Sequence, residues 1–156
     1  MRVLIIGYVW PEPNSSAAGS RMLALINCFR TEGWAVTFAS PAVVGDHSVD
    51  LAELGVNSQN IALNCSSFDE FILALQPDMV LFDRFMMEEQ FGWRVEKACP
   101  DALRILDTED LHCLRDARHQ AYKQLRDFCT NDLSSELNSG MALREAIVTA
   151  GSVRLR

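Results

Sequence analysis

Residues 2–8, RVLIIGY, decide the fold of this chain. They form an apolar run of strand length, rich in β-branched residues, which is typical of a strand buried on both faces of a parallel sheet. The next segment, 11–19, is rich in Pro, Ser, Ala and Gly, and it leads into apolar residues at helical spacing that stop before Gly33. The sequence therefore predicts a strand, a loop and a helix whose start faces the carboxyl edge of the sheet.

Ligands of open α/β sheets bind at this carboxyl edge. The exposed amides at the start of the helix favour an anion such as a phosphate or carboxylate, and small loop residues let a ligand approach the backbone. The segment contains neither G-x-G-x-x-G nor the lysine of a P-loop. An ordinary strand-loop-helix unit with nothing bound is therefore the alternative interpretation.

The rest of the chain alternates between strand and helix patterns. Ser67 and Glu70 have the spacing of a capping box at the start of one helix. This alternation predicts an α/β fold, a single Rossmann-like, doubly wound parallel sheet flanked by helices, over residues 1–130, followed by a helical or irregular tail over 131–156. The later strands are expected at 35–40, 60–63, 79–82 and 103–106, and the later helices at 67–76, 85–99 and 111–128, with a further short helix allowed within 45–55.

Length and composition restrict the class of protein. The chain has 156 residues, about the size of one domain, with 49% hydrophobic and 22% charged residues as in globular proteins. A formal net charge of −7 disfavours nucleic-acid binding. Five cysteines, odd in number and without a C-x-x-C pair, suit a reducing cytosol better than a disulfide framework or a zinc site. We expect a cytoplasmic protein with no signal peptide, membrane span, metal or cofactor, although peripheral membrane contact stays open.

Three segments resemble the amino-terminal half of glycosyltransferases with the GT-B fold, most closely bacterial enzymes of the retaining family four type. They are RVLIIGYVWPEPNSSAAGSRMLAL (2–25), LQPDMVLFDRF (75–85) and ALRILDTEDLHCLR (102–115). The resemblance implies two Rossmann-like domains, the first holding a glycan or lipid-linked acceptor and the second a nucleotide-sugar donor. At ~150 residues per domain, two such domains need a chain longer than this one. The expectation is thus an acceptor-side domain without its donor domain, inactive alone and able to self-associate through the surface left uncovered.

The resemblance also implies site residues. Sugar transfer needs a cation or amides near the leaving diphosphate and a group that accepts a proton from the acceptor hydroxyl. Arg21, expected in the first turn of the first helix, could supply the cation. The residues expected to bind substrate are Asn14, Ser15, Ser16, Gly19, Arg21, Asp83 and Glu109, and those expected to be catalytic are Asp110 and His112.

Simpler interpretations of these residues remain open. Arg21 could be solvated, Asp110 could cap the following helix, His112 could be a surface residue and Asp83 could only close its strand. The basic face of the last predicted helix, which carries Arg115, His119, Tyr122 and Arg126, could be a solvated surface or could bind an acidic lipid or anionic acceptor.

The alternative function is a free-standing Rossmann-like module that binds an anionic small molecule or a protein partner. A receiver domain is disfavoured because Gly7 and Tyr8 stand where its acidic pair would be. An NAD-dependent dehydrogenase is disfavoured because the glycine fingerprint is missing and no acidic residue ends the second predicted strand.

Overall fold

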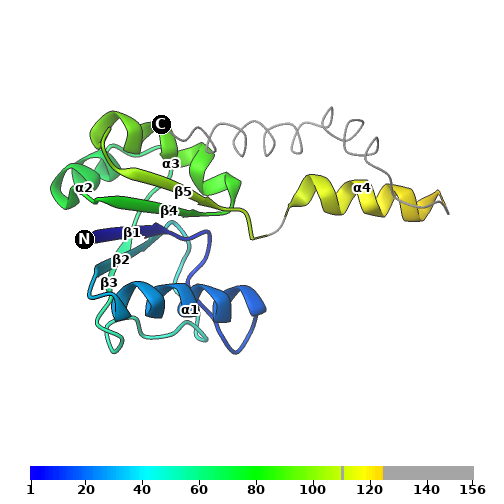
Figure 1. Cartoon of the computed structure of the whole chain (residues 1–156), viewed down its shortest axis with the longest axis horizontal. Helices are drawn as coiled ribbons and strands as arrows, with labels where there is room; N and C mark the ends of the chain where they lie inside the picture. Colours follow the sequence, from blue (N-terminus) through cyan, green and yellow to red (C-terminus); the bar gives the residue numbers. More distant parts are fainter. Residues whose placement is uncertain (110, 125–156) are drawn as a thin grey trace. The chain divides into compact units, whose positions relative to one another are not determined.

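The computed structural model describes residues 1–109 and 111–124 (Figure 1). The chain divides into two compact units, Met1–Asp107 and Thr108–Arg156. Asp110, the predicted helical segment beyond residue 124 and the predicted tail over 131–156 lie outside the described residues. Within the described part of the chain, no helix is both long enough and apolar enough to cross a membrane.

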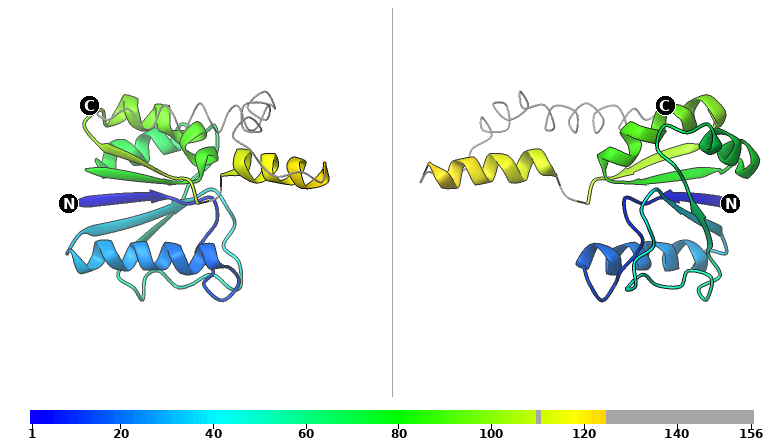
Figure 2. Two further views of the ribbon diagram at one scale, coloured as in Figure 1. Left: turned by 45° about the vertical axis from the view of Figure 1, so that its right-hand side comes forward. Right: turned by 180° about the vertical axis from the view of Figure 1, so that it is seen from behind.

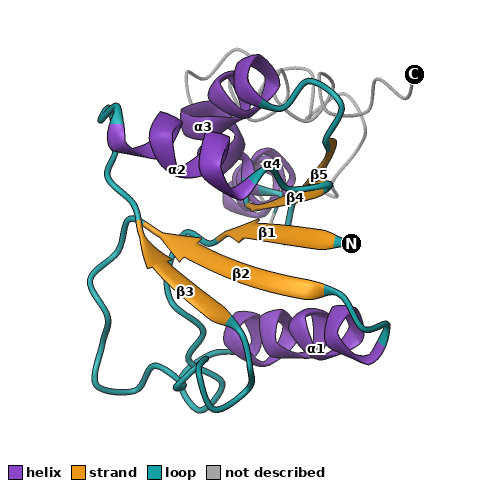
Figure 3. Cartoon of the chain, turned by 90° about the vertical axis from the view of Figure 1, so that its left-hand side faces the viewer, coloured by secondary structure: helices purple, strands orange, loops and turns teal. Residues whose placement is uncertain are grey.

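The first unit is built on a five-stranded, all-parallel sheet with strand order β3-β2-β1-β4-β5 (Figure 3). The strand order reverses between β1 and β4, which makes this place the topological switch point of the sheet. The predicted α/β, Rossmann-like fold is therefore confirmed. The strands are β1 (Arg2–Ile6), β2 (Ala35–Ser40), β3 (Asn57–Asn60), β4 (Met79–Asp83) and β5 (Leu103–Asp107).

Helices cover both faces of this sheet. Helix α1 (Ala17–Thr31) lies on one face, and α2 (Ser67–Leu75) and α3 (Phe85–Ala98) lie on the other, as the two views in Figure 2 agree. Alternate residues of β1 enter two separate cores: Val3 and Ile5 pack in the core that contains Met22 of α1, whereas Leu4 packs in the core that contains Phe68 of α2. This explains why residues 3–6, VLII, are apolar throughout rather than alternating.

Two predictions about the segment between β2 and α2 are wrong. The third strand spans Asn57–Asn60 rather than 60–63, and all of its residues are exposed. Its strand conformation comes from parallel pairing with β2, in which Ser40 lies opposite Asn60, so apolar patterning could not locate it. Residues 51–55 form turns instead of a short helix, and Gly55 at φ +65° closes them.

The helix starts differ from one another in how they are capped. Ser16 is the N-cap of α1 and its side chain accepts a hydrogen bond from Gly19. Ser66, rather than Ser67, precedes α2 and makes no side-chain capping bond, so the predicted capping box does not form. In the second unit, α4 spans His112–Lys123, with Arg115, His119 and Tyr122 exposed.

Candidate functional site

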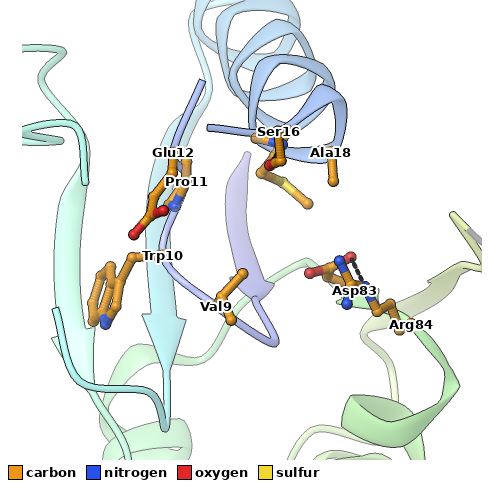
Figure 4. Close-up of a pocket in the computed structure, with 10 residues that line it drawn as sticks. Val9, Trp10, Pro11, Glu12, Ser16, Ala18, Asp83 and Arg84 are labelled. Atoms are coloured by element: carbon orange, nitrogen blue, oxygen red, sulfur yellow. Dashed lines mark hydrogen bonds and ion pairs between the residues drawn. The ribbon is translucent and has the colours of Figure 1, made fainter. Parts of the chain in front are cut away.

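A pocket with a volume of about 130 Å³ opens at the carboxyl ends of β1 and β4. One part of its wall comes from the loop between β1 and α1, another from the first turns of α1, and a third from the end of β4 (Figure 4). This is the switch point, where open α/β sheets bind their ligands. The lining residues are Val9, Trp10, Pro11, Glu12, Ser16, Ala18, Gly19, Met22, Asp83 and Arg84.

The loop after β1 is anchored on both sides of that strand. On the β2 side, the Gly7 amide donates to the carbonyl of Ala39 over 2.8 Å, and the indole Nε1 of Trp10 donates to the carbonyl of Ala42, also over 2.8 Å. On the β4 side, the Tyr8 amide donates to Oδ2 of Asp83 over 3.1 Å. These hydrogen bonds fix the loop where it enters the pocket.

The same loop then packs over the first turn of α1. The carbonyl of Glu12 accepts hydrogen bonds from the amides of Ser15 and Ser16, each over 3.1 Å. A Cβ atom at Gly19 would lie 2.4 Å from that carbonyl oxygen, so only glycine allows this approach. The hydroxyl of Ser16 accepts a hydrogen bond from the Gly19 amide over 3.0 Å, which is a typical N-cap.

Asp83 and Arg84 form the wall of the pocket opposite Pro11 and Glu12 (Figure 4). The Asp83 side chain is 8% exposed, and its Oδ1 lies 3.7 Å from Nε of Arg84. The guanidinium of Arg84 lies 5.1 Å from the ring centroid of Tyr8, which is close enough for a cation–π interaction. The Arg84 amide donates to the carbonyl of Asp107 over 2.8 Å, which ties β4 to β5.

The backbone of Arg84 is strained. Its φ of 73° and ψ of 154° fall in a region that is almost restricted to glycine and costs other residues about 1–3 kcal/mol. Such strain persists only where the surrounding contacts impose it, and it concentrates at functional sites. At the end of β4, the residue with this strained backbone lines the pocket.

A second ion pair lies beside the first. Asp107 is the register partner of Asp83 on the neighbouring parallel strand, and its carboxylate binds Nη1 of Arg21. Both aspartates are buried, whereas the Arg21 side chain is 49% exposed. The predicted place of Arg21, in the first turn of the helix, is wrong: since α1 begins at Ala17, Arg21 lies in the second turn. Its charge is directed at a protein carboxylate.

The structure brings only some of the predicted site residues together. Ser16, Gly19 and Asp83 line the pocket. Asn14 and Ser15 are exposed in the preceding loop and are not among the lining residues.

The remaining predicted residues belong to the second unit. Glu109 is exposed with φ 49°, His112 is the first residue of α4, and Asp110 lies outside the described residues.

Sequence reasoning did not select Arg84 or Glu12 as site residues, although both line the pocket. The position of Arg84 directly after a buried strand was a usable signal, because that position reaches the carboxyl edge. Nothing in the sequence marks Glu12. Among the residues that the structure describes, no three His, Cys, Asp or Glu side chains gather as a metal site would require.

Comparisons with known proteins add little. No protein-family model matches the chain, and neither does any curated protein. Among solved structures, the chain is similar to the glycinamide-RNase-transformylase T from Mycobacterium tuberculosis, with a TM-score of 0.44 and 22% sequence identity over 80% of this chain. The chain covers 35% of the length of that protein.

Proposed function

We propose that the unit Met1–Asp107 is the acceptor-side domain of a glycosyltransferase with the GT-B fold, which transfers a sugar from a nucleotide-sugar donor to a glycan or lipid-linked acceptor. The observation that carries the proposal is the pocket between β1 and β4. Its walls come from two of the three segments that resemble the family, namely 2–25 and 75–85. The sheet order also suits the proposal, because it is the order of a Rossmann-like domain.

The size of the pocket favours an acceptor over a donor. Pockets for drug-sized ligands occupy about 300–1,000 Å³, whereas this one has a volume of about 130 Å³. That volume suits a single ring or the reacting end of a longer chain better than a whole nucleotide-sugar. Beside the pocket, Tyr8 and Val9 are 40% and 48% exposed, and they offer apolar surface to the carbon face of such a ring.

Under this proposal the site residues have distinct tasks. Asp83 holds the loop after β1 through the Tyr8 amide and presents carboxylate oxygens to acceptor hydroxyls. The resemblance assigns the acceptance of the hydroxyl proton to Asp110 and His112, which belong to the second unit. The cysteine pattern favours a reducing compartment as the cellular setting.

The test is a binding screen of the purified chain against an array of glycans, lipid-linked sugars and nucleotide-sugars. We expect glycans or lipid-linked sugars to bind and Ala18→Phe to abolish that binding, because Ala18 lines the pocket and a phenyl group would fill it. The matched control is Ala24→Phe, at an exposed position of the same helix, which should bind as the wild type does.

Binding of nucleotides or simple anions, without any glycan or lipid-linked sugar, would contradict the proposal. It would favour instead a free-standing module that recognises an anionic small molecule.

A further inference from the structure

Two arginines at the carboxyl edge lie against buried carboxylates. Arg84 lies beside Asp83, with 3.7 Å between Nε and Oδ1, and Arg21 binds Asp107. The charges of these two aspartates and two arginines are balanced in pairs, and Glu12 adds a further carboxylate to the pocket wall. From this compensation we infer, building on the proposed function, that the pocket selects an uncharged sugar ring of the acceptor and disfavours a phosphorylated one.

A phosphate in the pocket would have to compete with these aspartates. Asp83 and Asp107 are 6% and 9% exposed, and they are register partners on adjacent strands. Drawing either arginine away would separate a buried carboxylate from a guanidinium that pairs with it, which is unfavourable. A phosphate bound beside the intact pairs would instead approach Asp83 itself and be repelled by it.

The start of α1 is already partly occupied. Amides at a helix start can bind an anion, but here the loop and the N-cap already take several of them. The Ser16 side chain takes the Gly19 amide, and the Glu12 carbonyl takes the amides of Ser15 and Ser16. The close approach of Glu12 to Gly19 also places a carbonyl oxygen, with its partial negative charge, against the first turn.

A neutral sugar fits the same groups without disturbing them. A sugar hydroxyl both donates and accepts hydrogen bonds, so it can donate to an Asp83 oxygen while the ion pair remains. The Ser16 oxygen accepts from the Gly19 amide, and a serine hydroxyl also has one hydrogen to donate. Asp83 and Ser16, both in the pocket wall, therefore supply an acceptor and a donor to one ring.

Isothermal titration of the full chain tests this inference with three probes: methyl hexopyranosides, the corresponding hexose phosphates and inorganic phosphate. We expect the wild type to bind at least one methyl hexopyranoside more tightly than its phosphate, by roughly threefold or more. Neutral-sugar binding should also change little between low and high salt, because screening weakens only charge-dependent binding.

The Asp83→Asn variant should reverse this preference. An amide oxygen can still accept the Tyr8 hydrogen bond, but the carboxylate charge 3.7 Å from Nε of Arg84 is removed. The affinity for hexose phosphate should therefore rise by roughly threefold to tenfold. The matched control is Asp78→Asn, at the residue before β4, which removes an exposed ion pair with Arg2 and should leave both affinities unchanged.

The possible results separate the two claims. If the wild type binds hexose phosphate more tightly than the neutral sugar, the inference fails while the acceptor-side function stands. If neither kind of sugar binds the wild type at all, the proposed function fails and the inference with it. If Asp83→Asn does not fold, the wild-type preference and its salt dependence still decide the matter.

Discussion

Arg84 carries the clearest mark of constraint at the scale of single residues. Its φ of 73° and ψ of 154° suit glycine, so a glycine at this position should relieve the strain. We predict that Arg84→Gly has a free energy of unfolding about 1–2 kcal/mol higher than Arg84→Ala, although both variants lose the same side-chain contacts. Urea denaturation measures the difference.

The alanine variant is the control, since at an unstrained position alanine is the more stable of the two by about 0.5–1 kcal/mol. If Arg84→Ala were more stable than Arg84→Gly, the backbone at residue 84 would not be strained.

A second residue, Glu88 on α3, links stability to pH. Burial of its carboxyl group is the main cause of its raised pKa. A Cβ atom added at Gly92 would lie only 2.5 Å from its Oε1. Because the pKa is higher in the folded than in the unfolded state, folding binds protons, and the contribution of Glu88 to stability is lost as the pH rises through the folded pKa.

We therefore predict that Glu88→Gln stabilises the protein at neutral pH and that this gain shrinks as the pH falls. Denaturation midpoints measured across the pH range check this, with Glu53→Gln at an exposed position as the control. A gain that stayed constant with pH would show that the ionisation of Glu88 is not involved.

At the scale of elements, the two helices with serine N-caps provide a matched comparison. Ser16 accepts a hydrogen bond from the Gly19 amide, whereas Ser66 makes no side-chain capping bond to α2. We predict that Ser16→Ala lowers the free energy of unfolding by about 1 kcal/mol and that Ser66→Ala changes it by only a few tenths. Equal losses from the two variants, measured by chemical denaturation, would contradict the capping role of Ser16.

The elements also show what the sequence could predict. Strands β1, β2, β4 and β5 are apolar runs, so local patterning located them, and the end of β4 placed Asp83 at the carboxyl edge, where it lines the pocket. Strand β3 reads NSQN and is a strand only because it pairs with β2, which no local pattern records.

The same limit applies to the site. The pair between Arg21 and Asp107 joins residues 86 positions apart, and the strain at Arg84 arises from tertiary contacts. The small residues of the loop and the acid at the strand end were therefore predictable. The pairing of the two aspartates with the two arginines was not.

At the scale of the whole molecule, the order of the strands decides where a ligand can bind. From β1 the chain goes on to α1 on one face, and from β4 it goes on to α3 on the other (Figure 3). The two loops therefore diverge at the switch point and leave a pocket between them. Residues far apart in sequence, Ser16 and Asp83 among them, become neighbours there. The central claim is that this pocket binds the acceptor sugar.

Titration of the ¹⁵N-labelled chain with methyl hexopyranosides, followed by amide chemical shifts, tests that claim most directly. Saturable shifts are predicted at Val9, Ser16, Ala18 and Arg84, which all line the pocket, with none along β3 at the edge of the sheet. Shifts confined to other parts of the sheet, or no shift at any concentration of sugar, would contradict it.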